Sequence, residues 1–298
     1  MKRLFIYLSR IPYYLRFLNS KIYYKLKLFR LNNRKNEYIF NEFFIEKKLQ
    51  ELKHNGICTL KLKEILDNKK EIEVIDFIKD IQSKQKKTFE KEFLDNFIGG
   101  DFLTNRNFKF NLNNPLYELA INPTLITIVR KYFNHPCKLI DIQLAKTKVI
   151  KEKNGRVYSQ RWHKDPSQIG VIKIFIYFSN VTSDSGPFEY LEHTHYRYKN
   201  KNTPRSKRII GGSFYPKEQL IDNYIEHNEK DKKCLTGKKG TIIIADTSGF
   251  HRGGFSRKRS RTMSTFAYYP KFDPIKSRIK ASKKDKKIIS NLQREFIT

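Results

Sequence analysis

The sequence predicts a mainly β protein with helices on its N-terminal side (α+β), built around a barrel or jelly roll. After Cys137, short runs of β-branched and aromatic residues alternate with turn residues at irregular spacing. Before Cys137, apolar residues recur at spacings of three and four, which is typical of helices. The 298 residues, 39% hydrophobic and 14% aromatic, provide enough apolar mass for one large folded domain.

The N-terminal segment, residues 1–36, is predicted to be basic and amphipathic. From Met1 to Lys35 it carries ten basic residues and no acidic one, with apolar residues at helical spacing. Such a face either lies on an anionic membrane or docks against the protein itself, and the sequence leaves both open. No apolar stretch reaches the roughly 18–20 residues of a membrane span. Arg10 and Pro12 interrupt any signal-peptide core, so we expect the segment to be retained.

Three helices and a strand are predicted before the β-rich region. Glu42 to Asn55 has helical periodicity and ends at Gly56, a residue suited to a left-handed cap. A short strand and a lysine-rich helical region to about Phe97 follow. Asn122-Pro123 provides a helix N-cap and first turn, and that helix closes before Pro136.

The β-rich region predicts the jelly-roll core at about residues 139–270, within a domain of residues 37–270. The polar segment 196–239 interrupts it as an insertion or lid. Residues 271–298 form a basic tail, either a helix or a disordered arm. The predicted strands are Leu139 to Val149, Val171 to Val181, Phe188 to Leu191, Thr241 to Ala245 and Thr262 to Tyr269.

The charge and the cysteine content indicate which partners and which compartment to expect. The 61 Lys and Arg against 30 Asp and Glu give a net charge of +31, which favours anionic partners or reflects a compositional bias. The three cysteines, Cys58, Cys137 and Cys234, form no CxxC pair and no disulfide framework. A cytoplasmic protein is expected, peripheral to the membrane if the N-terminal segment binds lipid.

Three residues have the types and spacing of a metal site. His163 and Asp165 are separated by one residue, so on an extended segment their side chains point the same way. His251 follows an apolar strand inside a glycine-flanked loop. Two histidines and one carboxylate make the facial triad of non-haem iron(II) oxygenases, which leaves positions for a bidentate keto-acid and O2.

Arg261, ten residues after His251, is the candidate for binding that keto-acid. It opens a strand, and its guanidinium offers two parallel charge-assisted hydrogen bonds to a carboxylate. Arg257, Lys258 and Arg259 are close competitors. Arg261 is favoured as the keto-acid ligand because the start of a strand holds its backbone rigidly.

These residues together resemble the phytanoyl-CoA dioxygenase family. The likeness covers roughly Phe44 to Pro270, and it includes the stretch from Gly186 to His195 and the strand and loop from Gly240 to His251. It implies a double-stranded β-helix (cupin-like jelly roll) and hydroxylation coupled to decarboxylation of 2-oxoglutarate. The expected cofactors are iron(II), 2-oxoglutarate and O2, with ascorbate as a further candidate.

The resemblance also implies residue roles. His163, Asp165 and His251 match the iron ligands, Arg261 matches the co-substrate arginine, and Lys148 is a further candidate for co-substrate contact. The carboxylate of Asp165 favours hydroxylation, since related halogenases have a small residue there. The family's Pro-Gly-Ser-His turn is replaced by residues 192–195, where only His195 is kept in type.

Three alternatives remain. A nucleic-acid demethylase of the same superfamily suits the net charge, but its second arginine is replaced by Ala267, Tyr268 and Tyr269. A non-catalytic binding protein on the same barrel would be expected to have lost part of the triad. A membrane-surface enzyme acting on lipid or glycan intermediates is supported by the N-terminal segment alone. The expected substrate is a small molecule, with an anionic group favoured by the charge.

Overall fold

The computed structural model describes residues 41–84, 101–103, 112–147, 149, 156, 158–166, 170–198, 202–204, 206–208, 214–279 and 281–297. The basic N-terminal segment, residues 1–36, and the co-substrate candidate Lys148 lie outside these ranges. Within them, no helix combines the length and the apolar character needed to cross a bilayer.

A six-stranded antiparallel sheet forms the larger half of the core, in the order β1-β9-β4-β11-β3-β2. Sequence neighbours are mostly not sheet neighbours, so the chain leaves this sheet and returns to it several times. Its strands are β1 (Ile57–Lys61), β2 (Asp101–Leu103), β3 (Cys137–Thr147), β4 (Ile172–Tyr177), β9 (Thr241–Asp246) and β11 (Arg261–Pro270).

A three-stranded sheet in the order β10-β5-β8 forms the smaller half. From β4 onward, the chain crosses repeatedly between the sheets: β4 lies in the larger sheet, β5 and then β8 in the smaller, β9 in the larger, β10 in the smaller and β11 in the larger. This is the winding of a double-stranded β-helix and confirms the predicted fold class. The smaller sheet holds β5 (Phe188–Leu191), β8 (Lys232–Leu235) and β10 (His251–Gly253).

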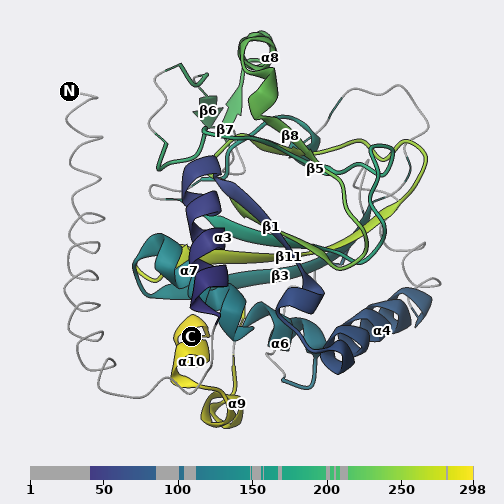
Figure 1. Ribbon diagram of the computed structural model, residues 1–298, viewed down its shortest axis with the longest axis vertical. Helices are drawn as coiled ribbons and strands as arrows, with labels where there is room; N and C mark the ends of the chain where they lie inside the picture. Colours follow the sequence, from purple (N-terminus) through teal and green to yellow (C-terminus); the bar gives the residue numbers. More distant parts are fainter. Residues whose placement is uncertain are drawn as a thin grey trace.

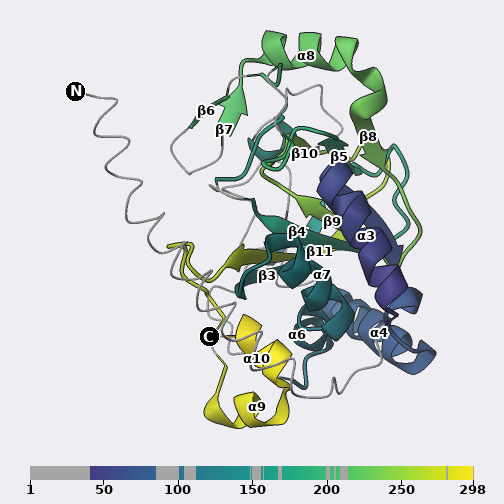
Figure 2. The same cartoon turned by 60° about the vertical axis from the view of Figure 1, so that its left-hand side comes forward.

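The segment 196–239, predicted as an insertion, contributes both core and accessory elements. It provides β8 to the smaller sheet, and it also holds a two-stranded β6–β7 hairpin and one longer helix. Figures 1 and 2 show this helix and the hairpin beyond the smaller sheet, at the end of the molecule away from α9 and α10. The accessory elements are β6 (Ser206–Arg208), β7 (Phe214–Pro216), α8 (Glu218–His227) and the short 3-10 helix η3 (Glu229–Asp231).

Helices pack on the face of the larger sheet that turns away from the smaller sheet (Figures 1 and 2). They are α3 (Glu42–Asn55), α4 (Asn68–Lys84), α6 (Pro115–Ala120) and α7 (Pro123–Phe133), with the 3-10 turn η1 (Leu62–Glu64). A second 3-10 turn, η2 (Tyr158–Gln160), lies instead against β10 of the smaller sheet. The predicted caps form: Gly56 ends α3 with a φ of 79°, and the Asn122 side chain accepts hydrogen bonds from the first turn of α7. A Cβ at Gly56 would press against Tyr190 and His195.

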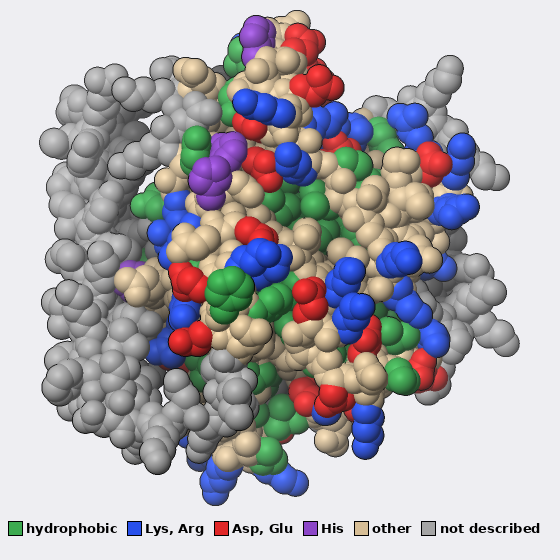
Figure 3. All heavy atoms as spheres, in the orientation of Figure 1, with side chains coloured by type: hydrophobic (Ala, Val, Ile, Leu, Met, Phe, Trp, Pro, Cys, Tyr) green, Lys and Arg blue, Asp and Glu red, His purple; other side chains and the backbone are tan. Residues whose placement is uncertain are grey.

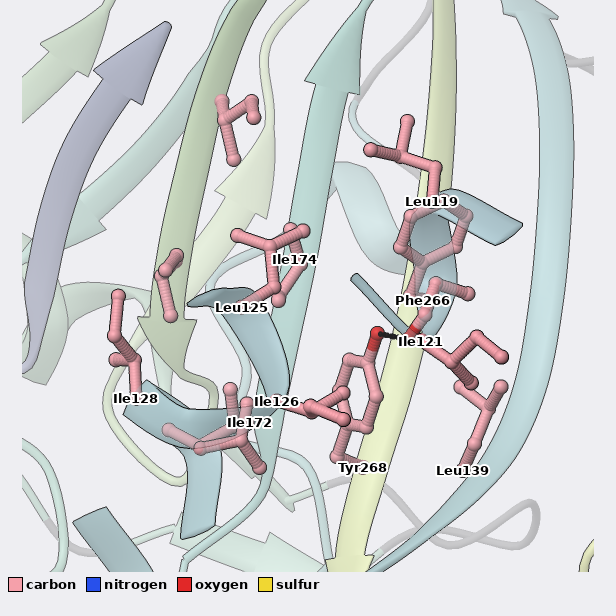
Figure 4. Packing of buried hydrophobic residues seen from close by; sticks show 14 of the residues in the cluster. Leu119, Ile121, Leu125, Ile126, Ile128, Leu139, Ile172, Ile174, Phe266 and Tyr268 are labelled. Atoms are coloured by element: carbon pink, nitrogen blue, oxygen red, sulfur yellow. Dashed lines mark hydrogen bonds between the residues drawn. The ribbon is translucent and has the colours of Figure 1, made fainter. Parts of the chain in front are cut away.

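The main hydrophobic core lies between these helices and the larger sheet. In Figure 4, Leu125 and Ile126 of α7 lie beside Ile172 and Ile174 of β4. The Tyr268 hydroxyl donates to the carbonyl of Ala120 at 2.7 Å, so its one polar atom is satisfied inside the core. This packing fixes the larger sheet as a rigid base for its opposite face.

The C-terminal residues complete the core. For residues 271–298 the sequence allowed a helix or a disordered arm, and the structure shows two short helices, α9 (Lys283–Ile288) and α10 (Asn291–Phe296). Phe296 is fully buried in the main core, and the buried Glu295 lies 3.4 Å from Arg130 of α7. These helices are therefore packed parts of the domain.

Side chains of β4 alternate between the two faces of the larger sheet. Ile172, Ile174 and Ile176 join the helix-side core, whereas Phe175 and Tyr177 join the cluster between the two sheets. Lys173 shares the inner face with Phe175. The inner face therefore carries the polar residues that could form a site.

Candidate metal and co-substrate site

The two candidate histidines are held side by side between the sheets. His163 and His251 form an antiparallel bridge in which each backbone N–H donates to the other residue's carbonyl at 3.0 Å. The Asp165 N–H donates to the carbonyl of Thr247 at 2.8 Å. His251, predicted in a loop, begins the short strand β10. Backbone pairing thus aligns the HxD segment with the turn after β9.

The three side chains converge on one point. One ligand atom from each of His163, Asp165 and His251 lies within 4.8 Å of the others, and all three residues are buried. His251 Nε2 lies 3.7 Å from Asp165 Oδ2. Among the residues that the structure describes, no other group of three metal-ligating side chains comes together.

Backbone carbonyls orient both imidazole rings. Nδ1 of His163 lies 2.8 Å from the carbonyl of Arg161, and Nδ1 of His251 lies 3.0 Å from that of Gly249. A carbonyl can only accept, so Nδ1 carries the proton and Nε2 keeps its lone pair free for a metal. The His163 ring also stacks on Tyr215, with centroids 5.6 Å apart.

The protonation states of the three candidate ligands suit the binding of a cation. Burial lowers the pKa of His251 to about 3, and it lowers the pKa of His163 as well, so both rings are neutral at pH 7. Burial alone would raise the pKa of Asp165, but Lys173 and the two histidines outweigh burial and bring it below its usual value. Two neutral imidazoles and one carboxylate are the donor set that suits iron(II).

Lys173 is a site residue that sequence reasoning missed. Its Nζ lies 2.6 Å from Asp165 Oδ2, inside the barrel, and its side chain is 25% exposed. A signal was present, since a single lysine interrupts the apolar run from Val171 to Phe178. Which face of the strand carries it could not be derived from spacing alone.

Arg261 lies buried on the inner face at the start of β11. Its Nη1 donates to the carbonyl of Gly186, its Nη2 lies 3.5 Å from the Thr147 hydroxyl, and it also interacts with the Tyr177 hydroxyl. Nε is buried with no hydrogen-bond partner among the described residues. A buried guanidinium without a carboxylate partner is suited to receive an acidic ligand.

Asp246 braces the turn that leads from β9 to His251. Its buried carboxylate accepts from the Tyr132 hydroxyl at 2.6 Å, from the Val171 N–H at 3.1 Å and from the Ser248 N–H at 3.0 Å. These bonds link α7, the start of β4 and the turn itself. The turn also contains Thr247, which pairs with Asp165, so the network supports two of the three candidate ligands.

His193 and His195 do not join the triad. His195 is buried, with Nε2 near the carbonyl of Lys53 at 3.1 Å, while the half-buried His193 packs its ring against His54. They connect the turn after β5 to the end of α3. The role of this histidine pair is therefore structural.

Comparisons with known proteins agree on the fold. No protein-family model matches the sequence, and no curated protein is detectably similar to it. Solved structures do match. EctD from S. alaskensis with bound Fe superposes with a TM-score of 0.56 at 15% identity, over 82% of this chain and 84% of that chain.

Two further structures were solved with a co-substrate. EctD from S. alaskensis with 2-oxoglutarate and 5-hydroxyectoine has a TM-score of 0.54 at 14% identity, over 79% of each chain. The epimerase SnoN in complex with Fe3+, alpha ketoglutarate and nogalamycin RO has a TM-score of 0.53 at 12% identity, over 77% of this chain and 85% of that chain. At such identities the likeness shows the shared fold, a jelly roll that in these proteins binds iron and 2-oxoglutarate.

Proposed function

We propose that this chain is an iron(II)- and 2-oxoglutarate-dependent dioxygenase that hydroxylates a small molecule. The observation that carries the proposal is the convergence of His163, Asp165 and His251 on one buried point, within a barrel that also buries Arg261. When bound, iron and 2-oxoglutarate would supply the oxidation, in which one atom of O2 enters the substrate C–H bond and the other enters succinate, with loss of CO2.

The residues divide this work by their chemistry. His163, Asp165 and His251 would hold the metal and leave three positions of an octahedral ion open. Arg261 would bind the distal carboxylate of 2-oxoglutarate, with Tyr177 fixing the guanidinium. Lys148 follows Thr147 at the end of β3 and remains a candidate for co-substrate contact. The carboxylate of Asp165 occupies the position that halogenases clear, which favours hydroxylation.

Membership of the phytanoyl-CoA dioxygenase family remains part of this proposal. It is supported by the order of the motifs along the chain and by the shared jelly-roll fold. Hydroxylation is likewise proposed, since one of the structural neighbours is an epimerase.

The face of the molecule seen in Figure 3 lacks the charge pattern of a nucleic-acid-binding surface. On the face seen in Figure 3, the Lys and Arg side chains of the described residues are scattered among acidic ones and form no continuous basic track. A track of that kind would follow a phosphate backbone.

The test is uncoupled turnover of 2-oxoglutarate in air, which needs no knowledge of the substrate. Purified protein with Fe(II), ascorbate and 2-oxoglutarate is expected to form succinate slowly. Asp165→Ala should abolish this formation, and His227→Ala, at an exposed histidine of α8, should leave it unchanged. Equal succinate formation by the wild type and Asp165→Ala would reject the proposal.

A further inference from the structure

Lys173 places a lysine ammonium beside a candidate metal ligand. In the sheet register it lies between Ala245 of β9 and Ala267 of β11, two residues whose small side chains leave the inner face open around it. Asp165 Oδ2, at 2.6 Å, is the carboxylate that it contacts among the described residues. A lysine in an otherwise apolar strand lowers stability relative to a Val or Ile at the same position. Its presence therefore indicates a functional role for the positive charge.

Lys173 lies at the opposite end of the barrel face from Arg261. Tyr177, which interacts with Arg261, is four residues further along β4 on the same face, about 13 Å away at the usual rise per residue. A co-substrate extending from the triad toward Arg261 would therefore lead away from Lys173. The lysine is left on the side of the triad that this co-substrate would not occupy.

On that side, Lys173 lies next to an apolar cluster that contains Val171, Ala267 and Tyr269, and one carboxylate stands beyond Ala267. Asp141 of β3 stands in the same row, beyond Ala267, and its Oδ2 is bound by Gln143 at 2.9 Å and by Arg278 at 3.2 Å. Asp141 already has its own cation. It lies two strands from Lys173, roughly 10 Å away, so it does not neutralise the lysine.

The formal charges of the loaded site balance without Lys173. This step depends on the proposed function. Iron(II) with Asp165, and the 2-oxoglutarate dianion with Arg261, carry charges that cancel. Lys173 adds one further positive charge, because the carboxylate that it contacts, Asp165, is already counted against iron(II). The loaded site would therefore carry one net positive charge, and excess charge in a largely buried site is costly.

We infer that Lys173 is the counter-ion for an anionic group of the substrate, and hence that the substrate is a small carboxylic or phosphoric acid. Lys173 contacts a candidate metal ligand, so an anion bound to it would lie close to the metal. The oxidised carbon is accordingly expected a few bonds from the anionic group.

The experiment measures binding to the full-length protein loaded anaerobically with Fe(II) and 2-oxoglutarate. The probes are small carboxylic acids and phosphate monoesters, each paired with its primary amide or parent alcohol. Binding is followed by calorimetry and by perturbation of the visible band of the iron-bound keto-acid. Wild type is compared with Lys173→Met, Lys173→Arg and Lys146→Met, the last at an exposed lysine of the same sheet.

The expected result is at least tenfold tighter binding of one or more acids than of their neutral partners. That preference should be lost in Lys173→Met and kept in Lys173→Arg and Lys146→Met. The inference is overturned if wild type shows no acid preference, whether both partners bind or neither does, or if Lys173→Met keeps the preference. A missing keto-acid band in iron-loaded wild type would instead reject the proposed function itself.

Discussion

The imidazoles of His163 and His251 are positioned by backbone pairing, so their side chains can be removed without breaking the scaffold. The bridge between these residues uses main-chain groups only, at 3.0 Å in both directions. Asp165 is likewise tied to Thr247 through its N–H. The ligand atoms can therefore be altered independently of the fold.

We expect His163→Ala, Asp165→Ala and His251→Ala each to abolish stoichiometric iron binding while leaving the circular dichroism spectrum unchanged. Each change removes one of three donors from a site that needs all three. Bound iron is measured after desalting, with His227→Ala as the matched control. Retention of one iron per chain by all three variants would contradict the assignment.

Arg261→Ala is expected to leave iron binding intact and to raise the 2-oxoglutarate concentration needed for half-maximal succinate formation by about 10- to 150-fold. Hydrogen bonds to a charged partner contribute about 1.5–3 kcal/mol, and each 1.4 kcal/mol is a factor of ten. Arg259→Ala serves as the control for the neighbouring basic loop. An unchanged requirement in Arg261→Ala, or a raised one in Arg259→Ala, would move the co-substrate role to another residue.

At the scale of elements, helix α7 and the turn after β9 are joined through one buried hydrogen bond. The Tyr132 hydroxyl donates to Asp246, and burial together with the nearby carboxylate raises the pKa of this tyrosine well above its usual value. Tyr132 therefore remains a neutral donor throughout the working pH range.

Tyr132→Phe should lower the free energy of unfolding by about 1–3 kcal/mol, because a buried carboxylate loses a donor that water cannot replace. Urea denaturation measures the change, and Tyr196→Phe, at a half-exposed tyrosine, should cost less than about 0.5 kcal/mol. Equal effects from the two variants would show that the Asp246 network does not brace the turn.

Local signals predicted the helices, and non-local pairing explains what sequence reasoning missed. Asn122-Pro123 and Gly56 fix the ends of α7 and α3 through their own backbone preferences, so these ends could be derived from a few residues. The pairing of β8 with β5 joins residues that are more than forty positions apart in the sequence, and no local pattern within 196–239 predicts it. His251 was singled out by residue type, but its bridge to His163 follows only from the fold.

For the whole molecule, the barrel and the C-terminal helices share one hydrophobic core. Four large apolar residues after residue 270 are buried in the main core: Ile279, Ile289, Phe296 and Ile297. At roughly 2 kcal/mol for each buried side chain, they contribute about as much as the 5–15 kcal/mol by which a domain is stable.

Ending the chain at residue 270 is therefore expected to give insoluble or unfolded protein, although the sequence alone placed the domain limit there. Phe296→Ala in the full chain should cost about 3–5 kcal/mol, and Ile288→Ala, at an exposed position of α9, should cost little. Thermal unfolding is measured for the truncated chain, for Phe296→Ala and for Ile288→Ala. A truncated chain that melts cooperatively at the wild-type temperature would show that the tail is dispensable.

The central claim is that His163, Asp165, His251 and Arg261 together bind iron(II) and 2-oxoglutarate, and anaerobic visible spectroscopy tests it most directly. Adding 2-oxoglutarate to the iron(II)-loaded protein should produce the weak charge-transfer band of a chelated keto-acid, and His251→Ala should lack that band. If the folded, iron-loaded wild type shows no band at saturating 2-oxoglutarate, the claim is contradicted and the barrel serves as a binding protein instead.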